Sequence, residues 1–523
     1  MSDPLAIHCA SPALQLGLLR AVLVAGAAIA LGGCAGSATR GEFAVSRADV
    51  LWLNRITYGI DSQTLTDFER RGRAGFLDSQ LSGRDAPLAP EIASQINLLD
   101  VVHADAAQLL AATNAEYKRI NELPDGPEKE QARKTLNERG NAFAYQAARR
   151  DVLRAIYSPA QLQEQLTWFW LNHFNVAQSK GSIRWLIGDY EERAIRPHVL
   201  GRFRDLLMAT LTHPAMLQYL DNAQNAVNHV NENYARELME LHTLGVAAGY
   251  TQADVQNLAR ILTGVGINAA GPAPKLQPAR QSLYRRDGAF EFNPARHDFA
   301  AKVLLGHVIR GQGFAEVEEA VDILVHQPAC AQFIAHKLAV YFVADEPPPA
   351  LVARMAATFS RSDGDIAAVL RVMFAAPEFS ASLGGKFKDP VHFVLSAMRL
   401  AYDTRPILNT HPVIGWLNAL AEPLYGHQTP DGYALTEAGW ASSGQMSRRF
   451  EIARAIAAPN AGLFEPEDGS IATGAGFPQL SSPVYFAALE PMLSERTKNA
   501  LAAATSQQEW NTLLLSSPEF NYR

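Results

Sequence analysis

The chain has 523 residues, which at about 150 residues per domain suggests about three domains or one large body. Its composition, 48% hydrophobic, 19% charged and 9% aromatic, excludes a disordered or fibrous chain. The net charge of −7 argues against a nucleic-acid partner, because proteins that neutralise phosphates carry an excess of lysine and arginine. Three cysteines in a chain of this length exclude a disulfide-dense scaffold.

The N-terminal segment predicts export. An apolar run at 21–31 follows Arg20 and has the length of a signal-peptide core, while it is too short to span a bilayer. It ends in the sequence LGGC at 31–34, the pattern of a bacterial lipoprotein signal, in which small residues fit the peptidase and the cysteine thiol accepts the lipid. The stretch before Arg20 is long for such a signal, and translation starting near Leu18 would shorten it.

From this pattern we predict a signal peptide at 1–33, lipidation of Cys34, a tether at 34–44 and a helical body at 45–523. Ala35 directly after the cysteine favours sorting to the outer membrane, where the protein would face the periplasm. The protein would then bind the membrane through the several acyl chains of its lipid anchor. The alternative is a cytosolic protein with a buried apolar N-terminal helix.

The body is expected to be mainly α, because apolar residues recur near the helical spacing and alternating strand patterns are scarce. The segment 91–157 is rich in Ala, Glu, Gln and Arg and predicts a long helical hairpin insertion broken at 124–127, either packed on the body or projecting from it. At most one or two small β-hairpins are expected, one of them at 283–292 around Asp287-Gly288. The segments 266–282 and 459–484 are loop-rich. Further helices are expected at about 190–212, 231–245, 251–264, 315–326, 329–342, 349–360, 363–375 and 389–402.

One local pattern recurs four times. An apolar helix end is followed by a proline at Pro214, Pro328, Pro377 and Pro518. Proline can close one helix and occupy the first position of the next. The spacing between the copies is irregular, so the pattern indicates shared turn chemistry and not a solenoid.

The densest polar segment is 231–245, NENYARELMELHTLG. On a helix, Arg236 forms i,i+4 pairs with Glu232 and Glu240, and Glu237 lies beside this stripe. Buried carboxylates on one helix repel one another, so a guanidinium among them is the expected compensation. We therefore predict that Arg236 lies at the centre of the main polar cluster, with Arg236→Met costing about 3–5 kcal/mol if the pairs are buried.

Four further segments complete a recognisable pattern. They are TWFWLNHF at 167–174, GYTQADV with ARILTG at 249–264, HDFAAK with LG at 297–306, and QTPDGY with Trp440 at 428–440. Together with 231–245 they resemble the bacterial family catalogued as domain of unknown function 1800, from about Leu51 to Arg523. The sequence departs from that pattern at Gly264-Val265, where a tryptophan commonly follows the glycine.

The resemblance implies a mostly helical protein, exported in many members, without an established activity. Genes for exported proteins with a sulfatase-like fold often lie beside those of the family, so such a protein is a candidate partner.

Metal or acid–base chemistry would need His and carboxylate side chains from several of these motifs to converge. The catalytic candidates are His173, Glu237, Glu240, His242, His297 and Asp298. The candidates for a divalent metal ion are His173, His242, His297 and Asp298. The other members of a candidate binding cluster are Asn172, Glu232, Asn233, Arg236, Lys302 and Asp431. The sequence contains no closely spaced metal signature, nucleophile elbow, P-loop or dinucleotide fingerprint.

Two functions fit these observations. The first is an accessory or binding lipoprotein of the cell envelope. The second is a metal-assisted hydrolase acting on envelope material, which requires His173, the 237–242 helix and the pair His297-Asp298 to meet in one cleft. A structural ion network around Arg236 is the alternative for the polar cluster. His297 and Asp298 are expected in a loop, where they have less reason to hold the core together.

Overall fold

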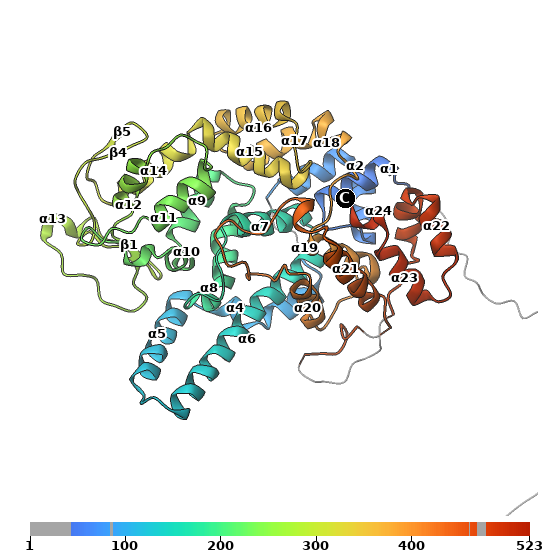
Figure 1. Ribbon diagram of the computed structural model, residues 1–523, viewed down its shortest axis with the longest axis horizontal. Coiled ribbons are helices and arrows are strands. Elements are labelled where there is room, and N and C mark those ends of the chain that lie inside the picture. The colour runs from blue at the N-terminus through green and yellow to red at the C-terminus, as the bar shows by residue number, and fades with distance from the viewer. Residues whose placement is uncertain (1–42, 84–86, 460, 468–476) are drawn as a thin grey trace, which may run out of the picture. The chain divides into compact units, whose positions relative to one another are not determined.

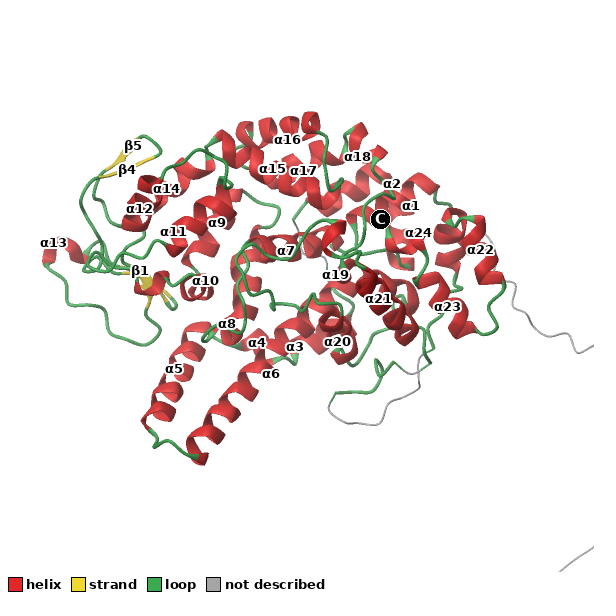
Figure 2. Ribbon diagram, in the orientation of Figure 1, coloured by secondary structure: helices red, strands yellow, loops and turns green. Residues whose placement is uncertain are grey.

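The computed structural model describes residues 43–83, 87–459, 461–467 and 477–523, and most of them are helical (Figure 1). Figure 2 shows that strands are confined to short pieces in one part of the chain. The mainly α class is therefore confirmed. The predicted signal peptide and Cys34 lie outside the described residues. No helix within these ranges combines the length and the apolar character needed to cross a membrane.

The α-helices as far as the first strand are α1 (Arg47–Ile56), α2 (Ser62–Leu81), α3 (Pro90–Asn97), α4 (Asp100–His103), α5 (Ala106–Glu122), α6 (Pro127–Tyr157), α7 (Gln161–His173), α8 (Ile183–Asp189), α9 (Phe203–Thr212), α10 (Pro214–Tyr219), α11 (Asn233–Glu237) and α12 (Gln252–Ile261). The later α-helices are α13 (Pro278–Gln281), α14 (Phe314–Val325), α15 (Pro328–Phe342), α16 (Pro349–Arg361), α17 (Ile366–Phe374), α18 (Pro377–Ala381), α19 (Pro390–Tyr402), α20 (His411–Ala419), α21 (Ser443–Ile456), α22 (Glu495–Ala502), α23 (Gln507–Leu515) and α24 (Pro518–Asn521). Among the described residues, three segments are π-helical: η1 (Tyr190–Ile195), η4 (Leu238–Thr243) and η6 (Tyr485–Leu489). The short 3₁₀ turns are η2 (Arg196–His198), η3 (Asn222–Gln224), η5 (Glu437–Gly439) and η7 (Glu490–Met492).

The strands form two small antiparallel sheets. Strand β3 (Phe290–Phe292) lies between β1 (Val265–Ile267) and β2 (Arg285–Asp287), with Glu291 opposite both Gly266 and Arg286. The expected hairpin at 283–292 is thus confirmed as β2–β3, with Gly288 in the left-handed region at its turn. Strands β4 (Lys302–Leu304) and β5 (His307–Ile309) form a separate hairpin.

Proline starts the helices that the recurring pattern predicted. Pro214, Pro328, Pro377 and Pro518 are the first residues of α10, α15, α18 and α24. The residue before each proline is extended, which ends the preceding helix and leaves the missing N–H where a helix does not need it. Another proline overturns the continuous helix expected at 190–212. Pro197 removes a hydrogen-bond donor, and the chain passes through η1 and η2 before α9 begins.

The segment 91–157 contains most of α3 together with α4, α5 and α6, and α5 and α6 form its long pair of neighbouring helices (Figure 1). A small apolar cluster of Ile120, Leu136 and Trp185 joins this pair to α8. The turn at 123–126 reverses the chain ahead of Pro127, the first residue of α6.

Helix α7 lies at the centre of the core. Trp168, Trp170 and Phe174 are buried at and just beyond its C-terminal end. Rings from other elements, including Phe203 and Phe333, surround His173 at the last turn of α7. This aromatic enclosure positions the candidate functional site.

Candidate functional site

Three motif segments and one unexpected helix meet at the end of α7. His173 is almost fully buried, and its Nε2 donates a hydrogen bond to the main-chain oxygen of His242 at 3.1 Å. The Nδ1 atom of His173 accepts a hydrogen bond from Lys337 Nζ at 2.9 Å. The carbonyl can only accept, so these contacts assign the neutral tautomer with the proton on Nε2. We call Lys337, His173, His242, Glu237 and Asp431 the lysine site.

A π-helical turn places His242. The segment 231–245 is helical from Asn233, but the helix widens at η4, where the Leu244 N–H bonds to the Met239 carbonyl, five residues back. Such turns insert one residue into an α-helix and often occur at functional sites. Here His242 is fully buried while Glu237 and Glu240 remain half-buried at the surface.

Burial and the lysine keep both imidazoles neutral. Burial, followed by the positive charge of Lys337, holds the pKa of His173 well below its ordinary value. The same two causes lower the pKa of His242 to about 3. Both ring nitrogens of His242 are buried without a hydrogen-bond partner among the described residues. An unsatisfied buried polar group costs about 1–3 kcal/mol, so His242 is an expensive residue for this core.

Lys337 is also poorly compensated. Burial lowers its pKa to about 8, and the Asp431 carboxylate only partly opposes this shift. No carboxylate of the described chain lies within ion-pair distance of its ammonium group, and His173 is its single hydrogen-bond partner there. Buried ammonium groups are normally paired with a carboxylate. Lys337 departs from that rule.

Carboxylates form the outer side of the lysine site. Burial, then the neighbouring Glu240, raises the pKa of Glu237, and Asp431 adds to the effect. Burial also acts to raise the pKa of Asp431, but hydrogen bonds from Thr429 and His427 outweigh it and lower that pKa. The pKa of Glu237 is therefore raised, whereas the pKa of the neighbouring Asp431 is lowered.

The loop that carries Asp431 is tied to α7 through its main chain. The Asn172 side chain accepts from the Tyr433 N–H at 2.6 Å and donates to the Tyr433 carbonyl at 3.1 Å. Gly432 has a positive φ of 76°, and a Cβ there would lie 2.2 Å from the Asn172 carbonyl oxygen. Asn172 thus positions the loop, and glycine is required where the loop meets the helix.

His297 and Lys302 belong to a second network, which we call the Glu316 network. His297 Nε2 and Lys302 Nζ both contact the Glu316 carboxylate, at 2.8 and 2.5 Å, and all three side chains have no solvent exposure. His297 Nδ1 bonds to the Thr263 carbonyl at 2.8 Å. The expectation that His297 contributes little to the core is therefore wrong, because its ring links a loop to the start of α14.

Asp298 does not form a metal-binding pair with His297, because its carboxylate is paired with an arginine. Its carboxylate forms an ion pair with Arg260 on α12 at 2.8 Å, and its main-chain N–H bonds to the Thr263 hydroxyl. The hydrolase interpretation required His297 and Asp298 to join the residues at 173 and 237–242. The structure instead places them in a network that shares no bonding partner with the lysine site. Across the described ranges, no three His, Cys, Asp or Glu side chains are grouped so that they could hold a metal ion.

Arg236 pairs as predicted but is not buried. It lies 3.2 Å from Glu232 and 3.6 Å from Glu240, and Gln252 on α12 accepts a third contact at 2.9 Å. Its side chain is 38% exposed, which corrects the expectation of a buried centre. Asn233 lies nearby and donates to the Leu220 carbonyl at 3.2 Å.

Sequence reasoning missed Lys337, although a signal was present. Lys337 follows Ile334 by three residues and precedes Tyr341 by four, so it lies on the apolar stripe of α15. A lysine on that stripe must either extend to solvent or find a buried partner. The partner, His173, is 164 residues away in the sequence and could not be identified from spacing.

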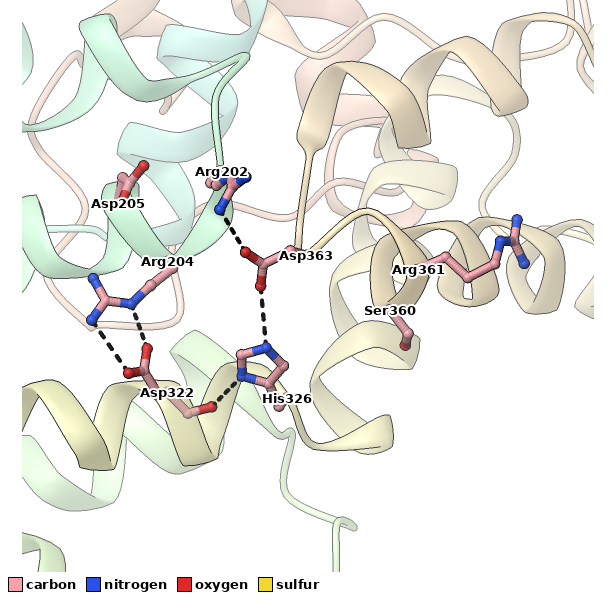
Figure 3. A pocket seen from close by; sticks show the side chains of 8 residues that line it. All are labelled: Arg202, Arg204, Asp205, Asp322, His326, Ser360, Arg361 and Asp363. Atoms are coloured by element: carbon pink, nitrogen blue, oxygen red, sulfur yellow. Dashed lines mark hydrogen bonds and ion pairs between the residues drawn. The ribbon is translucent and has the colours of Figure 1, made fainter.

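A wide cavity of about 750 Å³ lies elsewhere, between α9, α14 and the turn after α16 (Figure 3). Arg202 pairs with Asp363 at 2.6 Å, His326 contacts the same carboxylate at 3.1 Å, and Arg204 pairs with Asp322. Because these groups neutralise one another at an exposed surface, they form an ordinary ion-pair network of small net energy. None of the candidate residues lines this cavity.

The fold and the site define a mainly helical protein with an underpaired lysine beside two buried histidines. Residues 51–522 match the model of the family described as "Protein of unknown function (DUF1800)", and the chain belongs to this family. The family membership expected from the motifs is thereby confirmed. Comparisons with curated proteins and with solved structures gave no match.

Proposed function

We propose that the protein is an accessory or binding lipoprotein of the cell envelope, anchored at Cys34 to the outer membrane and facing the periplasm. The anchoring part of the proposal rests on the apolar run at 21–31 and the sequence LGGC at 31–34. The binding role is supported by one structural observation. The residues that a metal-assisted hydrolase would have to combine are divided between the lysine site and the Glu316 network.

The anchor is tested by fractionation of cells that produce the full chain. Cys34→Ala should remove radiolabelled palmitate from the protein and leave it as precursor or in the soluble fraction. Cys9→Ala is the matched control, because it removes a thiol on the other side of the predicted cleavage point and should change nothing. A Cys34→Ala variant that stays labelled and membrane-bound would contradict the lipoprotein assignment.

We further propose an exported sulfatase-like protein encoded nearby as the binding partner. The two purified proteins should associate in titration calorimetry, and the lysine site offers the polar groups for contact. Asp431→Asn tests that surface, because this side chain is 62% exposed and its loop is held by main-chain contacts that do not need the carboxylate. Unchanged binding by this variant would show that the contact lies outside the lysine site. If the wild-type protein gives no heat of binding, the proposed partner is wrong.

A further inference from the structure

We propose that Lys337 is a nucleophilic lysine that forms a reversible imine with a ligand carrying an aldehyde or ketone group. The proposal concerns the chemistry of the lysine site and is independent of the lipid anchor. It begins with the position of Nζ. This atom is fixed by the Nδ1 atom of His173, and that imidazole is itself fixed by the His242 carbonyl.

The surroundings of Nζ favour a free amine. A carboxylate partner, such as Glu316 for Lys302, stabilises the protonated form of a lysine, and that form is not nucleophilic. Lys337 instead donates to a neutral imidazole, and the ring of Phe333 lies 5.6 Å away. The groups that face it from neighbouring elements are His173 on α7, His242 on η4 and Asp431 on the 427–433 loop. Only Asp431 among them carries a negative charge, and no hydrogen bond joins it to Lys337 in the described part of the chain.

These surroundings match the known requirements of amine catalysis. Enzymes activate lysine nucleophiles by desolvation or by a nearby cation, which leaves part of the amine neutral at working pH. A pKa of about 8 leaves Lys337 roughly a quarter neutral at pH 7.5, against about 0.1% for an ordinary lysine. Lys337 is half-buried, so part of its side chain is open to solvent.

The reaction balances without an oxidant or reductant. The neutral Lys337 amine adds to the carbonyl carbon, and a proton moves from nitrogen to the former carbonyl oxygen. Water then leaves as the C=N bond forms. The ammonium first loses its proton to water, because Asp431 acts on Lys337 only through its charge and forms no hydrogen bond to it. Hydrolysis reverses each step and releases the ligand.

The test is competitive labelling of the purified full chain at pH 7.5. Propanal with sodium cyanoborohydride converts an imine to a stable secondary amine, which peptide mass spectrometry locates. Lys337 should be labelled roughly tenfold or more faster than Lys134, an exposed lysine on α6 whose side chain is 68% accessible. The ratio should fall towards one above about pH 11.5, where both amines are mostly neutral.

Acetic anhydride provides a second arm that reports nucleophilicity alone. Rapid acetylation of Lys337 without trapping by propanal would overturn the carbonyl ligand. Labelling of Lys337 no faster than Lys134 by either reagent would overturn the reactive lysine. Lys337→Met must lose the fast label, whereas His173→Leu should keep it, because burial, and not the hydrogen bond to His173, lowers the pKa of Lys337. Should either variant fail to fold, the wild-type ratio still decides the outcome.

Discussion

The lysine site and the Glu316 network are built from the same kinds of residue but differ in how completely those residues are paired. In the Glu316 network one carboxylate accepts hydrogen bonds from His297, Lys302 and the main-chain N–H groups of Gln312 and Gly313. In the lysine site the ammonium group has one neutral acceptor, and the His242 ring has no partner among the described residues. Both networks belong to the same helical body.

This difference separates a structural role from a functional one. A fully satisfied buried network costs little and fixes one arrangement, here a loop and strand β4 against the start of α14. An underpaired half-buried lysine and an unsatisfied buried histidine reduce stability, and proteins retain such groups where they serve a function. The two networks cannot be distinguished from the sequence alone, since each contributed histidines and acids to the candidate residues.

The largest expected effect tests the satisfied network. Glu316→Gln removes the charge that neutralises Lys302, and the variant should lose about 3–5 kcal/mol of unfolding free energy. Urea denaturation at pH 7 measures the change. Glu318→Gln is the control on the same helix, because its pair with Arg285 is exposed and should contribute less than about 1 kcal/mol. Equal stabilities for the two variants would show that the Glu316 network does not hold the core.

Substitution of Lys337 is expected to raise the free energy of unfolding, in contrast to substitution of Glu316. Its folded-state pKa of about 8 lies below the unfolded value of 10.5, so the unfolded chain binds more protons between these values. Wild-type stability should therefore rise with pH from about 8 to 10.5 through this group. Lys337→Met should be more stable than wild type at pH 7 by about 1–3 kcal/mol, with the difference vanishing above pH 10.5. A variant less stable than wild type at pH 7 would mean that the ammonium is well compensated.

The two histidines of the lysine site should respond differently to the same change. His173→Leu removes an acceptor and a donor and leaves Lys337 without a partner, which should cost about 1–3 kcal/mol. His242→Leu removes two unsatisfied ring nitrogens, so its effect should be within about 1 kcal/mol of zero. Thermal unfolding of both variants makes the comparison. A large loss for His242→Leu would reveal a partner for that ring and weaken the contrast between the two networks.

The contrast also shows what the sequence could predict. Local rules succeeded: proline placed the starts of four helices, Asp287-Gly288 placed a hairpin, and i,i+4 spacing paired Arg236 with two glutamates. Each of these features depends on residues within a few positions of one another. The motifs also identified the family and the three segments that carry His173, His242 and Asp431.

The failures were contacts between distant residues. Glu316 lies 19 residues from His297, and nothing in its local sequence marks it as the acceptor for that ring. Lys337 appears as one polar residue in an apolar helix until His173 is brought to it. The π-helical turn that buries His242 cannot be recognised from the i,i+4 spacing, since an ordinary α-helix over 231–245 has the same pairs.

The smallest expected effect concerns Arg236, which lies outside both networks. Exposed i,i+4 pairs contribute about 0.3–0.5 kcal/mol each, and the Arg236 side chain is 38% accessible. Arg236→Met should therefore cost less than about 1 kcal/mol in urea denaturation at low salt, and less still at 1 M salt, where surface charges are screened. Lys180→Met is a matched control, because Lys180 also has an exposed ion pair, with Asp221 at 2.8 Å. A cost of 3–5 kcal/mol for Arg236→Met alone would show that this arginine is buried in solution, as the sequence first suggested. The acidic side of the lysine site would then belong to the core, and the division between a satisfied and an underpaired network would no longer hold.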